Sequence, residues 1–95
     1  MTYELPKIGT EGWRVHYLGH SGDKIYISKE TINCIHIDKS GIYFLSTAMS
    51  SKNDRIYLTK EEALKVMKDY VEWLTKERNI KFIANPEDNS YTIIN

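Results

Sequence analysis

Four side chains of this 95-residue chain have the chemistry to bind a transition metal: His16, His20, Cys34 and His36. Zinc requires three or four nitrogen or sulfur ligands that converge at about 2.0 to 2.3 Å. Cys34 and His36 stand two residues apart, which is not a usual zinc-knuckle spacing, and His16 and His20 fall on an expected strand and turn. We therefore predict no metal and no other cofactor, with these four residues as the candidate ligands if a metal binds.

The same residues offer little catalytic chemistry. Cys34 with His36 or His16 would make a thiolate–imidazole pair only across strands, because neighbours on one face of a strand lie about 7 Å apart. The sequence shows no third group that would orient the histidine. We therefore predict that the chain is not an enzyme, and a small zinc-binding or Cys/His enzyme is kept as an alternative.

Basic and aromatic side chains form a larger set on the expected strands. If each strand alternates inward and outward residues, these side chains share the sheet face that points away from the helix, together with Ile32 and Cys34. Tyr and Arg dominate protein interfaces, and rings beside cations also stack nucleic-acid bases, but both types equally suit a plain soluble strand surface. The predicted binding face consists of Arg14, His16, Lys24, Tyr26, His36, Tyr43, Arg55 and Tyr57.

The elements that position this face follow from the spacing of apolar residues. Alternation at Trp13, Val15 and Tyr17, and again at Ile25 and Ile27, predicts a hairpin with these side chains turned inward. A second hairpin is expected around the turn 38–41, and a terminal hairpin around 85–90. The expected strands are 13–17, 24–28, 32–38, 42–47, 55–58, 80–84 and 91–94.

A helix is expected over residues 60–78. Thr59 and Glu62 have the spacing of a capping box, and apolar residues then recur at three- and four-residue steps through Met67 and Leu74. Asn79 suits the left-handed conformation that ends a helix. The order ββββ(β)αββ predicts an α+β fold, an antiparallel sheet of about five strands plus a C-terminal hairpin, with the helix on one face.

We expect residues 1–12 to form an N-terminal arm and residues 13–95 a single domain. Thirteen basic and thirteen acidic residues give a formal charge of zero, so no general attraction to DNA or anionic lipid is expected. The one cysteine and the lack of a secretion or membrane-spanning signal favour the cytoplasm.

The strands that end at Ile56-Tyr57-Leu58-Thr59 and the helix that follows resemble, over residues 13–78, the transcription-coactivator and Whirly type of single-strand binder. This resemblance is one of topology, and it implies nucleic-acid binding. The size, neutral charge and lack of catalytic geometry favour instead a small regulatory or accessory protein that contacts another protein, of the inhibitor type that phages and bacteria encode. We also expect a homodimer, because so small a domain gains stability by covering a second sheet face. A single-stranded nucleic-acid-binding module remains the alternative.

Overall fold

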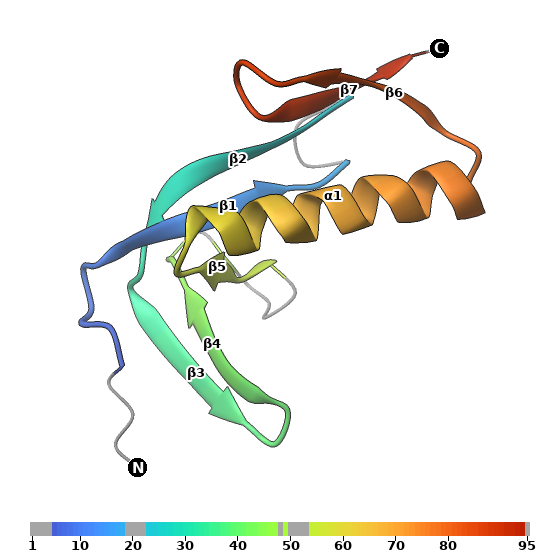
Figure 1. The fold of residues 1–95 in the computed structure, drawn as a ribbon. Helices are drawn as coiled ribbons and strands as arrows, with labels where there is room; N and C mark the ends of the chain where they lie inside the picture. The colour runs from blue at the N-terminus through green and yellow to red at the C-terminus, as the bar shows by residue number, and fades with distance from the viewer. Residues whose placement is uncertain (1–4, 19–22, 48, 50–53, 95) are drawn as a thin grey trace.

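The computed structural model describes residues 5–18, 23–47, 49 and 54–94, and it shows one helix packed on a seven-stranded antiparallel sheet (Figure 1). The predicted α+β class and order of elements are confirmed. The C-terminal hairpin belongs to the same sheet, because its second strand pairs with an N-terminal strand. In sequence order the elements are β1 (Glu11–His16), β2 (Lys24–Thr31), β3 (Cys34–Asp38), β4 (Gly41–Leu45), β5 (Ile56–Tyr57), α1 (Lys60–Glu77), β6 (Lys81–Asn85) and β7 (Ser90–Ile94).

Two predicted hairpins form the ends of a sheet whose strand order is β3-β4-β5-β1-β2-β7-β6. The pairs β1–β2, β3–β4 and β6–β7 are each antiparallel neighbours in sequence. The β3–β4 turn ends at Gly41, whose φ of 145° is a conformation that other residues adopt only with strain. Figure 1 shows β3 and β4 extending away from the body and beyond the helix. The strands β3 and β6 are the two outer edges.

The helix begins at Lys60, as the sequence predicts, and ends at Glu77, one residue before the predicted end. The Thr59 hydroxyl accepts a hydrogen bond from the Glu62 backbone N–H at 3.2 Å, which satisfies one donor of the first turn. At the other end Asn79 has a φ of 54°, so the chain turns out of the helix and into β6. The helix therefore has fixed ends, and its apolar stripe is aligned with the sheet.

The main core lies between α1 and the central strands. Val15 and Ile25 from the sheet pack against Met67, Val71 and Leu74 from the helix. The residues predicted to turn inward from the first hairpin all contribute to this core. They are Trp13, Val15, Tyr17, Ile25 and Ile27.

A second, smaller core was not predicted. Ile32, Met49 and Ile56 are buried together, and Ile35 and Phe44 pack against them. The prediction that Ile32 lies on an uncovered face is wrong, because this side chain is 0% exposed. Ile56 is the direct neighbour of Arg14, so this core lies on the sheet face opposite α1, which we call the rear face. The face that carries α1 is called the helix face.

The segment before the first predicted strand contacts the body. Gly9 donates its backbone N–H to the Ile32 carbonyl at 2.8 Å, and Ile32 donates its own to the Thr10 carbonyl at 2.8 Å. Strand β1 begins at Glu11, inside the range expected to be an arm.

Among the described residues, no helix is long and apolar enough to cross a membrane.

Candidate functional site

The strand register divides the predicted binding face between the two sides of the sheet. Arg14 pairs with Ile56, and Trp13 pairs with Tyr57, so Tyr57 lies on the helix face while Arg14 lies on the rear face. His16 pairs with Tyr26 on the rear face. The predicted set therefore separates into a rear group, Arg14, His16, Lys24 and Tyr26, and a helix-face group, His36, Tyr43, Arg55 and Tyr57.

The prediction that all eight residues share one face was wrong because it relied on alternation within single strands. It predicts which residues share a side of one strand, but the side itself depends on how the strand pairs with its neighbour. Phe44 pairs with Ile56, so the apolar residues of β4 and β5 that fill the second core set the direction of the tyrosines beside them. Tyr43 and Tyr57 consequently point to the helix face, and Tyr43 is only 7% exposed.

The rear group is held by contacts within the protein. Arg14 makes a two-point ion pair with Asp54, with Nε–Oδ1 at 3.2 Å and Nη2–Oδ2 at 2.5 Å. The two side chains are only 15% and 17% exposed. His16 stacks on Tyr26 with ring centroids 4.2 Å apart, and its Nε2 lies 2.6 Å from Ser28 Oγ. These side chains form a half-buried polar layer rather than an open surface.

Lys24 makes an exposed ion pair with the C-terminal hairpin. Its ammonium lies 3.1 Å from an Asp88 carboxylate oxygen, and Ser90 Oγ donates to the same carboxylate at 2.6 Å. The hydrogen bond from Ser90, followed by the contact with Lys24, lowers the pKa of Asp88. Arg14 and Lys24 thus each have a carboxylate partner, which reduces their attraction for phosphate.

The end of the β3–β4 hairpin carries two different faces. On one side Asp38 accepts hydrogen bonds from Ser40 Oγ at 2.6 Å and contacts His36 Nε2 at 3.2 Å. On the other side Ile37 and Ile42 are direct cross-strand partners, and both are exposed. The polar contacts explain His36 as a residue that helps to fix the turn.

A row of aromatic side chains lies along one flank of α1, and we call Tyr17, Tyr57, Tyr70 and Trp73 the aromatic row. Tyr17 and Tyr70 meet edge to face with centroids 4.8 Å apart, and Tyr70 stacks beside Trp73 at 6.4 Å. The Arg78 guanidinium lies 5.6 Å from the Trp73 ring. Trp73 is 47% exposed, although its neighbours in the row are half-buried.

The inner end of the row is desolvated. Burial raises the pKa of the Tyr17 hydroxyl well above its ordinary value of 10.0, and the charge of Tyr57 and a hydrogen bond with it raise the pKa further. The positive charge of Arg55 opposes this shift. Arg55 also lies over the Tyr43 ring at 4.4 Å. The row therefore runs from a half-buried inner end near β5 to an exposed tryptophan near the end of the helix.

The sequence patterns do not identify this row as a site. They predict Tyr17 in the core and Trp73 at the margin of the helical stripe, which is where both residues lie. The sequence did carry one signal for this row, a large aromatic residue at the margin of an amphipathic stripe. The row itself could not be predicted from that residue, because it depends on the contact between Tyr17 and Tyr70, which are distant in the chain.

The candidate metal ligands are not brought together. His16 lies on the rear face of β1, whereas Cys34 and His36 lie on the helix face of β3, and two strands, β4 and β5, separate β3 from β1. His20 lies outside the described residues. Within the described part of the chain, no three His, Cys, Asp or Glu side chains form a group that could hold a metal.

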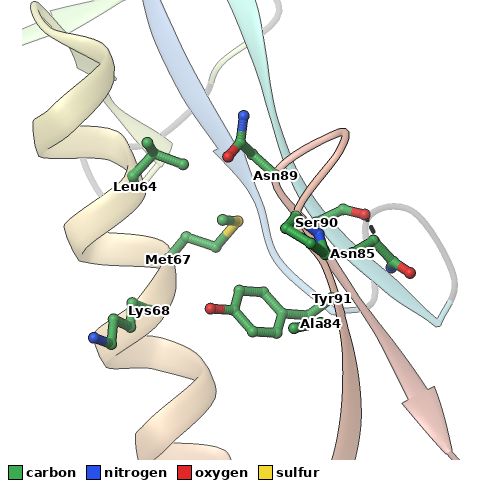
Figure 2. A pocket seen from close by; sticks show the side chains of 9 residues that line it. Leu64, Met67, Lys68, Ala84, Asn85, Asn89, Ser90 and Tyr91 are labelled. Carbon is green, nitrogen blue, oxygen red and sulfur yellow. Dashed lines mark hydrogen bonds between the residues drawn. The ribbon is translucent and has the colours of Figure 1, made fainter.

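A groove between α1 and the β6–β7 hairpin has a volume of about 260 Å³. Figure 2 shows Met67 from the helix and Tyr91 from β7 reaching into it, with Leu64 and Lys68 along the helix side. Ligand pockets are usually larger, about 300 to 1,000 Å³, and combine apolar walls with convergent polar groups. We interpret the groove as the seam between helix and hairpin.

The chain matches no protein-family model, and no curated protein or solved structure is significantly similar to it.

Proposed function

We propose that this chain is a non-enzymatic binding protein that regulates another protein by direct contact, and that it acts as a homodimer in the cytoplasm. The contact surface is the exposed end of the aromatic row, at Trp73, together with Arg78 beside it. Such a role is that of a small accessory or inhibitor-type protein of a phage or bacterium.

The observation that carries the proposal is the exposed Trp73 ring. A tryptophan is costly to leave in water, and Trp, Tyr and Arg are the residue types on which protein interfaces most depend. The stack with Tyr70 and the guanidinium of Arg78 hold the ring in one orientation. A ring that is already ordered loses little side-chain entropy on binding.

The partner that fits this surface is an apolar protein segment with an oxygen acceptor at one end. The apolar part would cover the Trp73 ring, which is 47% exposed. A carbonyl or carboxylate oxygen would meet the Arg78 guanidinium beside it. Both requirements are met by a peptide or a protein loop.

The nucleic-acid alternative has less support. It needs accessible tyrosine rings and cations available to phosphate. Tyr43 is buried, and Arg14 and Lys24 face the carboxylates of Asp54 and Asp88. The formal net charge of zero also gives no broad basic surface.

A tagged pull-down from lysate tests the proposal, with each sample divided into nuclease-treated and untreated halves. The wild-type chain is compared with Trp73→Ala and with Ile37→Ala, which removes another exposed apolar side chain far along the β3–β4 hairpin. We expect a stoichiometric protein that survives nuclease, is lost with Trp73→Ala and is kept with Ile37→Ala. Calorimetry with that protein should show binding weakened about 10- to 100-fold by Trp73→Ala.

Two results would overturn this reading. Recovery of nucleic acid, or of proteins that disappear after nuclease treatment, would support the single-strand-binding alternative. A protein retained equally by wild type and Trp73→Ala would exclude the aromatic row as the contact surface.

A further inference from the structure

Among the described strands, β6 is one of the two outer strands of the sheet, and its one neighbour is β7. An outer strand presents backbone N–H and C=O groups that no neighbour satisfies, so natural proteins usually guard it with charges, proline or a covering segment. The only charged residue of β6 is Lys81 at its start, and Pro86 stands just beyond its end. Its central residues are apolar, with Ile83 53% exposed.

The hydrogen-bond pattern shows which backbone groups of β6 point outward. Ile93 of β7 donates its N–H toward β2, to the carbonyl of the residue before that strand, at 3.0 Å. Because bonding direction alternates along an antiparallel strand, Thr92 directs its groups toward its partner Ile83 in β6. By the same alternation, the N–H and C=O groups of Phe82 and Ala84 point away from β7.

We propose that two copies of this chain pair through β6 as antiparallel strands, with Ile83 on the two-fold axis, to form one continuous sheet. In this register Phe82 of each copy stands opposite Ala84 of the other. Each of these two pairs exchanges both backbone hydrogen bonds, so every outward-pointing group of Phe82 and Ala84 is satisfied. The proposal rests on the homodimer of the proposed function and names its interface.

The side chains of β6 are compatible with this register. Phe82 opposite Ala84 sets a large side chain beside a small one on the helix face. Lys81 stands opposite Asn85 of the second copy, so no like charges meet. On the rear face the two Ile83 side chains become direct cross-strand neighbours with Cβ atoms about 4.5 to 5.5 Å apart.

The apolar surface beside the axis is continuous with this contact. Ile94 is exposed on the rear face of β7, diagonally across from Ile83, because Ile83 pairs with Thr92 and Lys81 pairs with Ile94. Pairing about Ile83 therefore creates one apolar strip on the rear face. It runs from Ile94 and Ile83 of one copy across the axis to Ile83 and Ile94 of the second copy. A symmetric interface of this kind repeats the same patch on both chains.

The other outer strand is less suited to self-pairing. Strand β3 ends at Asp38, with Lys39 next to it, and charges at an edge disfavour strand addition. Pairing of β3 with itself about its middle residue would place the two His36 rings side by side. Self-pairing therefore suits β6, whose three central residues are all apolar, better than β3, whose central residue is His36.

Disulfide crosslinking tests the register. In a Cys34→Ser background, Ile83→Cys places its thiol on the axis, where the Cβ separation approaches that of a disulfide, about 3.5 to 4.5 Å. Ile37→Cys is the matched control, because Ile37 is an exposed isoleucine near the edge formed by β3. Under mild oxidation we expect covalent dimer to form from Ile83→Cys at least about tenfold faster than from Ile37→Cys.

Ala84→Pro provides a second test. Proline removes the outward N–H of Ala84 and costs no bond to β7, so the fold should survive while pairing is blocked. Sedimentation equilibrium up to about 100 μM should show a dimer for wild type and for Ala84→Ser, and a monomer with native circular dichroism for Ala84→Pro. A monomeric wild type would overturn the homodimer together with this interface. A dimer that survives Ala84→Pro, or that crosslinks no faster at position 83 than at position 37, would overturn the β6 register alone.

Discussion

Trp13 and Tyr57 are direct cross-strand partners in β1 and β5, and both side chains lie on the helix face. The Lys60 ammonium from the first turn of α1 lies 5.5 Å from the centre of the Trp13 ring. The start of the helix is thereby held over the short strand that leads into it. The same pair places Tyr57 beside Tyr17 and anchors the inner end of the aromatic row.

Replacement of Tyr57 should therefore affect stability. We expect Tyr57→Ala to lower the free energy of unfolding by about 2 to 4 kcal/mol, because it leaves a cavity beneath the helix. Trp73→Ala, at an exposed position of the same row, should change it by less than about 1 kcal/mol. Urea denaturation of the two variants measures the difference. Equal effects would mean that Tyr57 does not belong to the core.

The helix and the strand segments could be predicted because each depends on residues close in sequence. The Thr59 cap uses a backbone N–H three residues away, and the apolar stripe from Ala63 to Leu74 needs only helical periodicity. Gly41 likewise marks its turn through its own backbone conformation. Local signals of this kind were enough to predict the fold class and the order of elements.

The side of the sheet on which each tyrosine lies could not be predicted in the same way. Tyr57 and Ile56 are adjacent, and either could face the helix until the pairing of β5 with β1 is known. The decision depends on burial of Ile56 with Ile32 and Met49, which come from separate segments. For the rear group the side of the sheet was predicted correctly, because β1 and β2 form one hairpin, whose register the alternation of both strands fixes together.

The Arg14–Asp54 ion pair should contribute to stability because both side chains are mostly buried. Removal of one partner leaves the other charge unpaired, so we expect Asp54→Ala to lower the free energy of unfolding by about 1 to 3 kcal/mol. Adding Arg14→Met to this variant should recover most of the loss. A double-mutant cycle followed by urea denaturation measures the coupling, and a coupling near zero would contradict a structural role for the pair.

Stability should fall at high pH because of Tyr17. Burial holds the pKa of this hydroxyl above its unfolded value of 10.0, so above that pH the unfolded chain releases the proton while the folded chain keeps it. The contribution is therefore fully present below about pH 10 and is lost as the pH rises further. Urea midpoints measured between about pH 8 and pH 11 should decline less steeply for Tyr17→Phe than for wild type. Identical slopes would show that Tyr17 ionises alike in both states.

Gly12 is needed where β1 approaches β5. A Cβ atom at this position would lie 2.6 Å from the Tyr57 carbonyl oxygen and would also collide with the Ile56 side chain. Since a backbone atom cannot move aside cheaply, we expect Gly12→Ala to push β5 away and lower the free energy of unfolding by about 1 to 3 kcal/mol. Glu11→Ala, at the exposed neighbouring position, is the control and should change it by less than about 0.5 kcal/mol. Among the described strands, β5 is the one that joins the β3–β4 hairpin to β1 in the sheet, so amide exchange of the hairpin should rise selectively in Gly12→Ala. Unchanged stability and exchange would mean that β5 tolerates a wider separation from β1.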